Sequence, residues 1–253
     1  MLALEFPPIN EILRWRDVVE PIGLNKVAII AVLASLISIV IFLLAARQDG
    51  MKAPKGVRNF AETIVEFIET QIIMPTMGRD GMGWTPFMLS LFAFIYLCNL
   101  PGIIPVLYMP ATARIAIPMF LALLVWVIFI GVGFKHQGPA YIKNSLFPPG
   151  VPGPLYILVA PIEFISTFLV RPFSLTVRLF ANLLAGHILL VTFSLLSEEL
   201  FQGDNAALIP VGILPLFMLM FITAFEVLVG FLQAYIFTIL AAVYIGGAAH
   251  PEH

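Results

Sequence analysis

The chain has 253 residues, of which 60% are hydrophobic and only 11% are charged, and its formal net charge is −2. Soluble globular domains carry about 25% charged residues, so this composition excludes that class and indicates an integral membrane protein. The small negative charge offers no basic field for nucleic acid. The single cysteine, Cys98, excludes an internal disulfide framework and a multi-cysteine metal site.

Three membrane spans are predicted in the first part of the chain, after an N-terminal tail (residues 1–26) whose early charges do not fit a cleavable signal peptide. Each span is an uncharged run long enough to cross about 30 Å of hydrocarbon as a helix. Pro101 and Pro105 are expected to bend the far end of the second span. The three spans are residues 27–46, 84–108 and 115–134.

Residues 56–73 differ in kind from these spans. Their apolar side chains recur at helical spacing, while Glu62, Glu66 and Glu69 fall on another face. This pattern predicts an amphipathic helix that lies at the membrane interface or against a partner.

Two much longer apolar tracts, residues 155–200 and 206–249, complete the chain. A helix of forty residues is about 60 Å long, which is twice the thickness of the hydrocarbon core. Each tract therefore forms either two spans or one long, strongly tilted helix. Because the first tract lacks a polar turn, we expect a tilted antiparallel hairpin. The predicted fold is a single all-α membrane domain of about five membrane helices and one amphipathic helix.

The distribution of Lys and Arg orients the predicted helices. With the N-terminus outside and the C-terminus in the cytoplasm, more basic residues lie inside than outside. The lack of a basic, serine-rich presequence favours the bacterial inner (plasma) membrane over an organelle. The inside set is Arg47, Lys52, Lys55, Arg58, Arg79, Lys135 and Lys143, and the outside set is Arg14, Arg16, Lys26 and Arg114.

Arg178 is the most informative residue, because it lies deep inside an apolar tract. A guanidinium cannot lose its charge, and placing one in mid-membrane costs at least about 2.5–3.5 kcal/mol. At 100° per residue, Arg178 shares one helix face with several polar residues, whereas His187 falls on the opposite face. The polar residues on the Arg178 face are Glu163, Arg171, Ser174 and Asn182, and those on one line of the second helix are Glu226, Gln233 and Tyr244.

Arg178 also divides the polar residues by depth. Glu163 lies about 22 Å before it along the helix axis and His187 about 13 Å beyond it. Counted back from the connector, Glu226 has a similar depth to Arg178, so the hairpin is expected to bring these two together.

Structural interpretations of the same residues remain open. His187 and Glu226 could form a packed pair, and Glu163 could neutralise Arg171. Asn182 and Gln233 could simply join two helices by a hydrogen bond. Arg178 is the exception, because no acidic residue lies one turn away on its own helix.

Titratable carboxylates and an imidazole can transfer a proton, whereas a fixed cation between them interrupts direct passage. A path broken at Arg178 would conduct only if a mobile partner with a buried acid carried the proton past it. This chain has no spare element for that task, so the sequence indicates one part of a larger machine.

The motifs resemble those of the a-subunit family of F-type ATP synthases, the stator channel of the membrane sector. The family signature is matched by Ser174-Leu-Thr-Val-Arg-Leu-Phe-Ala-Asn182 and the following Ala-Gly-His187. Leu232-Gln233-Ala-Tyr-Ile-Phe237 resembles the last family helix, and Asn99-Leu-Pro-Gly-Ile-Ile-Pro105 is similar to an earlier segment. The resemblance covers nearly the whole chain and is most specific in its last hundred residues.

The resemblance implies that Arg178 faces the ring of c subunits, where its charge makes a passing ring carboxyl group give up its proton and blocks a proton short circuit. His187 and Glu226 would carry protons from the outside, Asn182 and Gln233 would line the path, and Glu163 would serve the inner half-channel. Ser174 and Tyr244 are further expected path residues, and Arg171 matches no required family position. Further expected partners are a peripheral-stalk b subunit and the lipid bilayer.

No cofactor, metal or nucleic acid is expected. The chain has no Gly-x-x-x-x-Gly-Lys-Ser/Thr nucleotide loop, so it is not expected to be catalytic alone. The alternative is a self-contained proton-coupled secondary transporter, but that class often shows paired repeats, which this sequence lacks.

Overall fold

The computed structural model describes residues 17–19, 24–47, 56–104, 110–147, 155–202 and 209–249. Within these ranges, five helices are long and apolar enough to cross a membrane. They confirm the predicted all-α membrane fold. Their bounds are Lys26–Ala46, Arg79–Gly102, Ala116–Gln137, Tyr156–Phe201 and Pro210–Ala249.

Most of the described chain is helical, apart from a short antiparallel pair of strands near its start. Short 3-10 or π-helical segments, labelled η, join several of the helices. The strands are β1 (Asp17–Val19) and β2 (Leu24–Asn25). The helical elements are α2 (Lys26–Ala46), α3 (Val57–Ile68), η2 (Glu69–Ile73), α4 (Met74–Met77), η3 (Arg79–Trp84), α5 (Thr85–Asn99), η4 (Leu100–Gly102), η5 (Ala111–Ala113), α6 (Ala116–Gln137), α7 (Ala140–Leu146), α8 (Tyr156–Ile165), η7 (Ser166–Val170), α9 (Arg171–Gln202) and α10 (Ile209–Ala249).

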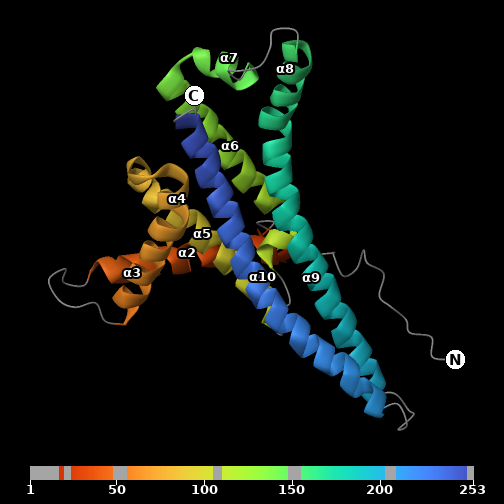
Figure 1. Ribbon diagram of the computed structural model, residues 1–253. Helices are drawn as coiled ribbons and strands as arrows, with labels where there is room; N and C mark the ends of the chain where they lie inside the picture. Colours follow the sequence, from red (N-terminus) through yellow and green to blue (C-terminus); the bar gives the residue numbers. More distant parts are fainter. Residues whose placement is uncertain are drawn as a thin grey trace.

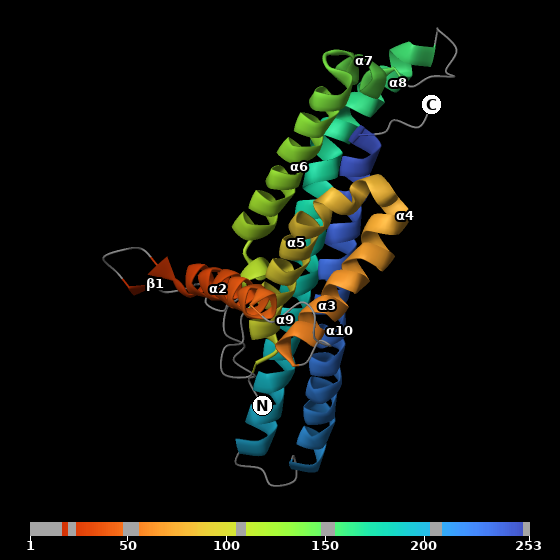
Figure 2. The ribbon, with the colours of Figure 1, turned by 90° about the vertical axis from the view of Figure 1, so that its left-hand side faces the viewer.

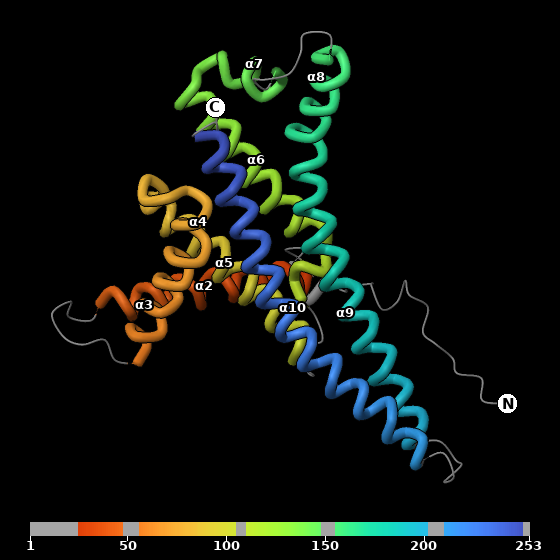
Figure 3. Tube along the Cα trace, viewed as in Figure 1, coloured from red at the N-terminus to blue at the C-terminus, as the bar shows by residue number. Residues whose placement is uncertain are grey.

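The two C-terminal tracts form one antiparallel hairpin that runs the length of the molecule (Figure 3). The first tract is continuous through α8, η7 and α9, and its 46 membrane-compatible residues extend about 69 Å. Helix α10 has 41 residues and extends about 62 Å. Neither tract is divided into two spans, so the single long helix is the alternative that the structure adopts.

Helix α2 crosses the hairpin at a steep angle in two perpendicular views (Figures 1 and 2). Helix α2 and the hairpin therefore cannot both run along the membrane normal. If α2 is parallel to the normal, the hairpin is strongly tilted, and its length requires such a tilt in a hydrocarbon core of about 30 Å. Helix α9 packs against α6 as well as α10, and α10 also packs against α5.

The predicted amphipathic segment is helical in α3 and continues through the π-helical turn η2. Glu62 and Glu66 are exposed on it, whereas Ile68 and Ile72 are completely buried in the main core. Burying such a side chain contributes about 1.5–3 kcal/mol in a water-facing protein. The second half of the segment therefore anchors it to the spans.

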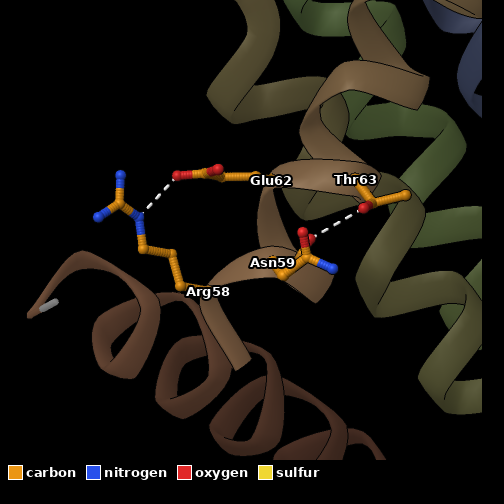
Figure 4. Close-up of polar contacts among 4 residues, drawn as sticks. All are labelled: Arg58, Asn59, Glu62 and Thr63. Atoms are coloured by element: carbon orange, nitrogen blue, oxygen red, sulfur yellow. Dashed lines mark hydrogen bonds and ion pairs between the residues drawn. The ribbon is translucent and has the colours of Figure 1, made fainter. Parts of the chain in front are cut away.

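The exposed face of α3 carries local polar contacts (Figure 4). Arg58 Nε donates to Glu62 Oε1 at 2.7 Å, and Thr63 Oγ1 donates to the carbonyl of Asn59 at 2.8 Å. An exposed ion pair four residues apart stabilises a helix by only about 0.3–0.5 kcal/mol. The contacts thus support the helix without building a site.

The second span ends earlier than the sequence predicted. Helix α5 stops at Asn99 and is followed by the tight turn η4, which contains Pro101. Residues 105–108 of the predicted span, including Pro105, lie outside the described residues. Proline has no N–H to continue the helical ladder, which accounts for the early end.

Asn99 links this early end to α10, a connection that the sequence did not reveal. Its Nδ2 donates to the carbonyl of Gly230 at 3.1 Å, and its Oδ1 accepts from Thr112 Oγ1 at 2.6 Å. Asn99 and Thr112 are both buried. Buried polar groups are costly unless paired, so the bond from Asn99 holds α10 at Gly230, between the predicted path residues Glu226 and Gln233.

Candidate functional site

Arg178 lies on a face of α9 that the other described residues leave exposed. Its neighbours Leu175, Leu179 and Leu183 are buried in the core, whereas Arg178 and Asn182 are exposed. Within the part of the chain that the structure describes, Arg178 makes no hydrogen bond or ion pair. A fixed charge in an apolar sector needs a partner, and none is present among the described residues.

One helical turn from Arg178, the two long helices are joined by a polar contact. Asn182 Nδ2 donates to Gln233 Oε1 at 2.9 Å. Gln233 is buried, and its Nε2 atom has no acceptor among the described residues. The interhelical bond that the sequence left open as a structural alternative is therefore present, and it leaves the Gln233 amide nitrogen available to water or a proton-carrying group.

His187 and Glu226 are buried between the hairpin helices, with only 5% and 4% of their surfaces exposed. His187 lies on the opposite side of α9 from the exposed Arg178, as the helical angles predicted. Both carboxylate oxygens of Glu226 are buried and lack a hydrogen-bond partner within the described ranges. A carboxylate in such surroundings is costly to keep without a ligand or a role.

Gly186 makes room for the Glu226 carboxylate. A Cβ at this position would lie 3.0 Å from Glu226 Oε1. The contact also corrects one expectation, because Glu226 faces Gly186, eight residues and about 12 Å beyond Arg178, rather than Arg178 itself. Counting residues back from the connector could not give this register, because the register depends on how α9 and α10 pack.

Replacing Gly186 with alanine is expected to push the Glu226 carboxylate aside by a few tenths of an ångström and to slow passive proton flux by up to about tenfold. Alanine favours a helix over glycine by about 0.5–1 kcal/mol, so helix weakening cannot cause the loss. Gly131→Ala in α6 is the matched control, because its Cβ would meet no atom within 4 Å. Equal flux in the two variants, measured in vesicles under an imposed voltage, would remove Gly186 from the site.

A polar cavity of about 330 Å³ is lined by residues of α6, α7, α8, η7, α9 and α10. Helices α7 and α8 and the C-terminal end of α10 lie towards the same end of the molecule (Figure 1). Glu163 and Tyr244, both predicted as path residues, line the cavity. Arg171, whose role the sequence left open, lines it as well. The full lining is Gln137, Tyr141, Asn144, Ser145, Glu163, Thr167, Arg171, Val243, Tyr244, Gly247 and Ala248.

The π-helical turn η7 brings Glu163 and Arg171 to the same cavity. In a regular helix, eight residues would place them about 80° apart around the axis. The wider turn at Ser166–Val170 absorbs one extra residue, which removes about 100° and leaves roughly 20° between them. They do not form an ion pair within the described chain, so the proposed local neutralisation is absent.

Arg171 is instead held by aromatic rings. Its Cζ atom lies 5.1 Å from the ring centroid of Tyr244 and 5.9 Å from that of Phe129. Such cation–π contacts contribute about 0.5–2 kcal/mol, more where water is excluded. Because Phe129 belongs to α6 and Tyr244 to α10, one guanidinium joins three membrane helices at the cavity.

Tyr141, on the short helix α7, also lines the polar cavity. Burial raises the pKa of its phenol, although a hydrogen bond with Ser145 and the charge of Arg171 act in the other direction. The phenol therefore stays protonated at neutral pH, as a donor. Gln137 Nε2 donates to the carbonyl of Ala248 at 3.0 Å and so attaches the end of α10 to α6 at the cavity rim.

The sequence-predicted residues thus fall into separate groups. One group, His187 and Glu226, is buried on one side of Arg178 along α9, and the polar cavity with Glu163 and Tyr244 lies on the other. Ser174 is half-buried between Arg171 and Arg178 and belongs to neither group. Among the described residues, no three His, Cys, Asp or Glu side chains gather to hold a metal ion.

These features define a multi-pass α-helical membrane protein with polar side chains buried between two long helices and one arginine exposed on their surface. A family model described as ATP synthase A chain matches residues 27–246. The chain therefore belongs to this family, whose members are components of the synthase complex and not catalytic enzymes by themselves.

Similar proteins support this assignment over most of the chain. ATP synthase subunit a of Frankia alni is 43% identical over 233 residues, which cover 91% of this chain and 79% of the relative. ATP synthase subunit a of Acidiphilium cryptum is 40% identical, with 86% and 85% covered. ATP synthase subunit a 1 of Brucella anthropi is 44% identical, with 79% and 78% covered.

Proposed function

We propose that this chain provides two offset proton half-channels in the membrane sector of an ATP synthase, separated by Arg178. The single observation that carries the proposal is the exposed guanidinium of Arg178, which has no hydrogen bond or ion pair within the described residues. Its surroundings fit a passing carboxylate on another subunit. In a rotating ring of c subunits, each subunit would bring its own carboxylate past Arg178 in turn.

In this proposal, protons arrive from outside through His187 and Glu226, which are buried on one side of Arg178. They neutralise ring carboxylates, and the ring turns through lipid. Each protonated carboxyl group then approaches Arg178, whose positive charge favours the ionised form, and its proton leaves through the polar cavity past Glu163 and Tyr244. One charge crossing 100 mV releases about 2.3 kcal/mol, so several protons are needed for each ATP.

Asn182, Gln233 and Ser174 have supporting positions in this scheme. The Asn182–Gln233 bond ties α10 to α9 beside Arg178, and the unused Gln233 Nε2 is available for the proton path. Ser174 lies one turn from Arg178 towards the polar cavity. In a bacterial plasma membrane, the N-terminus would lie outside and the C-terminus in the cytoplasm, and a peripheral-stalk b subunit would hold the chain against rotation.

The exposed position of Arg178 disfavours a self-contained secondary transporter. Such a carrier keeps its central charged residues facing its own substrate cavity between helices. Here the cavity with polar lining holds Arg171 and not Arg178. No observation in the described chain favours the transporter over the stator.

Purification in mild detergent tests the proposal. The chain is expected to co-isolate with a ring of small two-helix subunits, and a disulfide is expected to form between Ala181→Cys and a cysteine beside the ring carboxylate, because Ala181 is exposed one turn beyond Arg178. The matched control is Leu123→Cys on α6, which is also exposed but on another helix. A stable monomer that carries a small substrate, or equal cross-linking from both positions, would contradict the proposal.

A further inference from the structure

Arg171 is a permanently charged residue of the hairpin that the proposed proton path does not use. It makes no ion pair or hydrogen bond within the described part of the chain, yet it is fixed by the rings of Tyr244 and Phe129. Along α9 it is the lining residue of the polar cavity that lies nearest to Arg178. The lining of this cavity therefore includes a permanent positive charge on the side of Glu163 that is nearer to Arg178 along the chain.

The remainder of the lining would suit a metal cation if Arg171 were absent. Glu163 provides a carboxylate, and Gln137, Asn144 and Ser145 provide neutral side-chain groups with oxygen atoms. Oxygen atoms of these kinds are the ligands that hard cations prefer. Potassium and sodium are the abundant cations of cells, and one bound at Glu163 would block proton release.

The charge of Arg171 acts on a second residue that lines the polar cavity. Tyr141 has a phenol whose pKa is lowered by this charge, against the larger raising effect of burial. Water and salt weaken such an interaction with a Debye length of about 8–10 Å, which is comparable with the width of a cavity of this size. A metal cation inside it would therefore be repelled throughout.

We propose that Arg171 is a selectivity residue of the polar cavity, which keeps alkali-metal cations away from Glu163 and leaves this acid to protons. The inference rests on the proposed function, because it assumes that protons leave through this cavity. The π-helical turn η7 is part of the device, since it places Glu163 and Arg171 at the same cavity.

Thiol labelling measures the charge that the polar cavity presents, whether or not protons move. Gly247 lines the cavity and is exposed, and a Cβ there meets no atom within 4 Å, so Gly247→Cys should be tolerated. In inverted vesicles with the assembled complex, a sulfonate and a trimethylammonium methanethiosulfonate are compared. Arg171→Gln is expected to lower the ratio of anionic to cationic labelling rates by about three- to tenfold.

Three controls isolate the charge of Arg171. Arg171→Lys keeps the charge and should keep most of the ratio, whereas Lys135→Gln removes an exposed cation outside the lining and should leave it unchanged. The unsubstituted chain should not label, because its Cys98 is buried. If Arg171→Gln reduces assembly, Arg171→Met is used instead, because it keeps a long side chain against the rings. This variant is also expected to lower the ratio of anionic to cationic labelling rates.

A functional measurement completes the test. Replacing choline by potassium on the cavity side is expected to slow ATP-driven pumping several-fold in Arg171→Gln and to leave the unsubstituted complex unaffected. An unchanged labelling ratio in Arg171→Gln would overturn the proposal, as would failure of Gly247→Cys to label in any variant, because a closed cavity admits no cation. If the proposed function were wrong but Arg171 did set the charge of the cavity, the result would differ from these. Potassium would then not affect pumping in Arg171→Gln, whereas the labelling ratio would still depend on Arg171.

Discussion

Replacing Arg178 with alanine is expected to abolish ATP-driven proton pumping and to leave the complex assembled. The side chain is exposed and contributes nothing to the core of this chain, so packing should persist. The loss should be at least about 100-fold, the usual effect of removing a preorganised charge from a transfer site. Quenching of a pH-sensitive dye in inverted vesicles, with ATP hydrolysis followed in parallel, measures it.

The controls for this prediction separate charge from geometry. Arg114→Ala removes another exposed arginine, at the start of α6, and should leave pumping unchanged. Arg178→Lys keeps a charge but replaces the planar guanidinium by a shorter, strongly hydrated ammonium, and should restore little activity. Coupled pumping in Arg178→Ala would overturn the role given to this residue.

The Glu226→Gln variant should lower proton flux by at least about tenfold while the chain remains in the complex. Glutamine has nearly the shape of the buried carboxyl beside Gly186 but cannot bind or release a proton. General acid–base groups contribute about 10²–10⁴-fold to the transfers they assist. Passive conduction through the membrane sector, and ATP-driven pumping, should fall together.

The appropriate comparison for Glu226→Gln is Glu62→Gln, which removes an exposed carboxylate from α3. That change should have no effect on flux. His187→Ala is expected to act like Glu226→Gln, because both residues belong to the buried group beyond Arg178. Normal proton flux in both variants would show that His187 and Glu226 have only a structural role.

The sequence predicted the features that depend on one helix at a time. The number of spans follows from the length of uncharged runs, because the bilayer fixes how many apolar residues a helix needs. The separation of Arg178 and His187 onto opposite faces of α9 follows from 100° per residue. Both features required no knowledge of the neighbouring helices, and the structure has both.

What the sequence did not predict depends on contacts between helices or on local irregularity. The register of the hairpin places Glu226 against Gly186, and only the packing of α10 on α9 determines it. The turn at Ser166–Val170 breaks the regular rotation that the helical angles assumed. Arg171 could not be interpreted because its ring partners come from α6 and α10, more than forty residues away on either side.

The central claim is that Arg178 separates two proton paths, and proton conduction through a ring that cannot turn tests it most directly. A disulfide from Ala181→Cys to a ring cysteine would lock the ring in reconstituted membrane sectors. Under an imposed voltage, the locked sector with Arg178 should conduct no protons, whereas the locked sector with Arg178→Ala should leak, because one ring carboxylate could then exchange protons with both paths. Equal tightness of the two locked sectors would contradict the account.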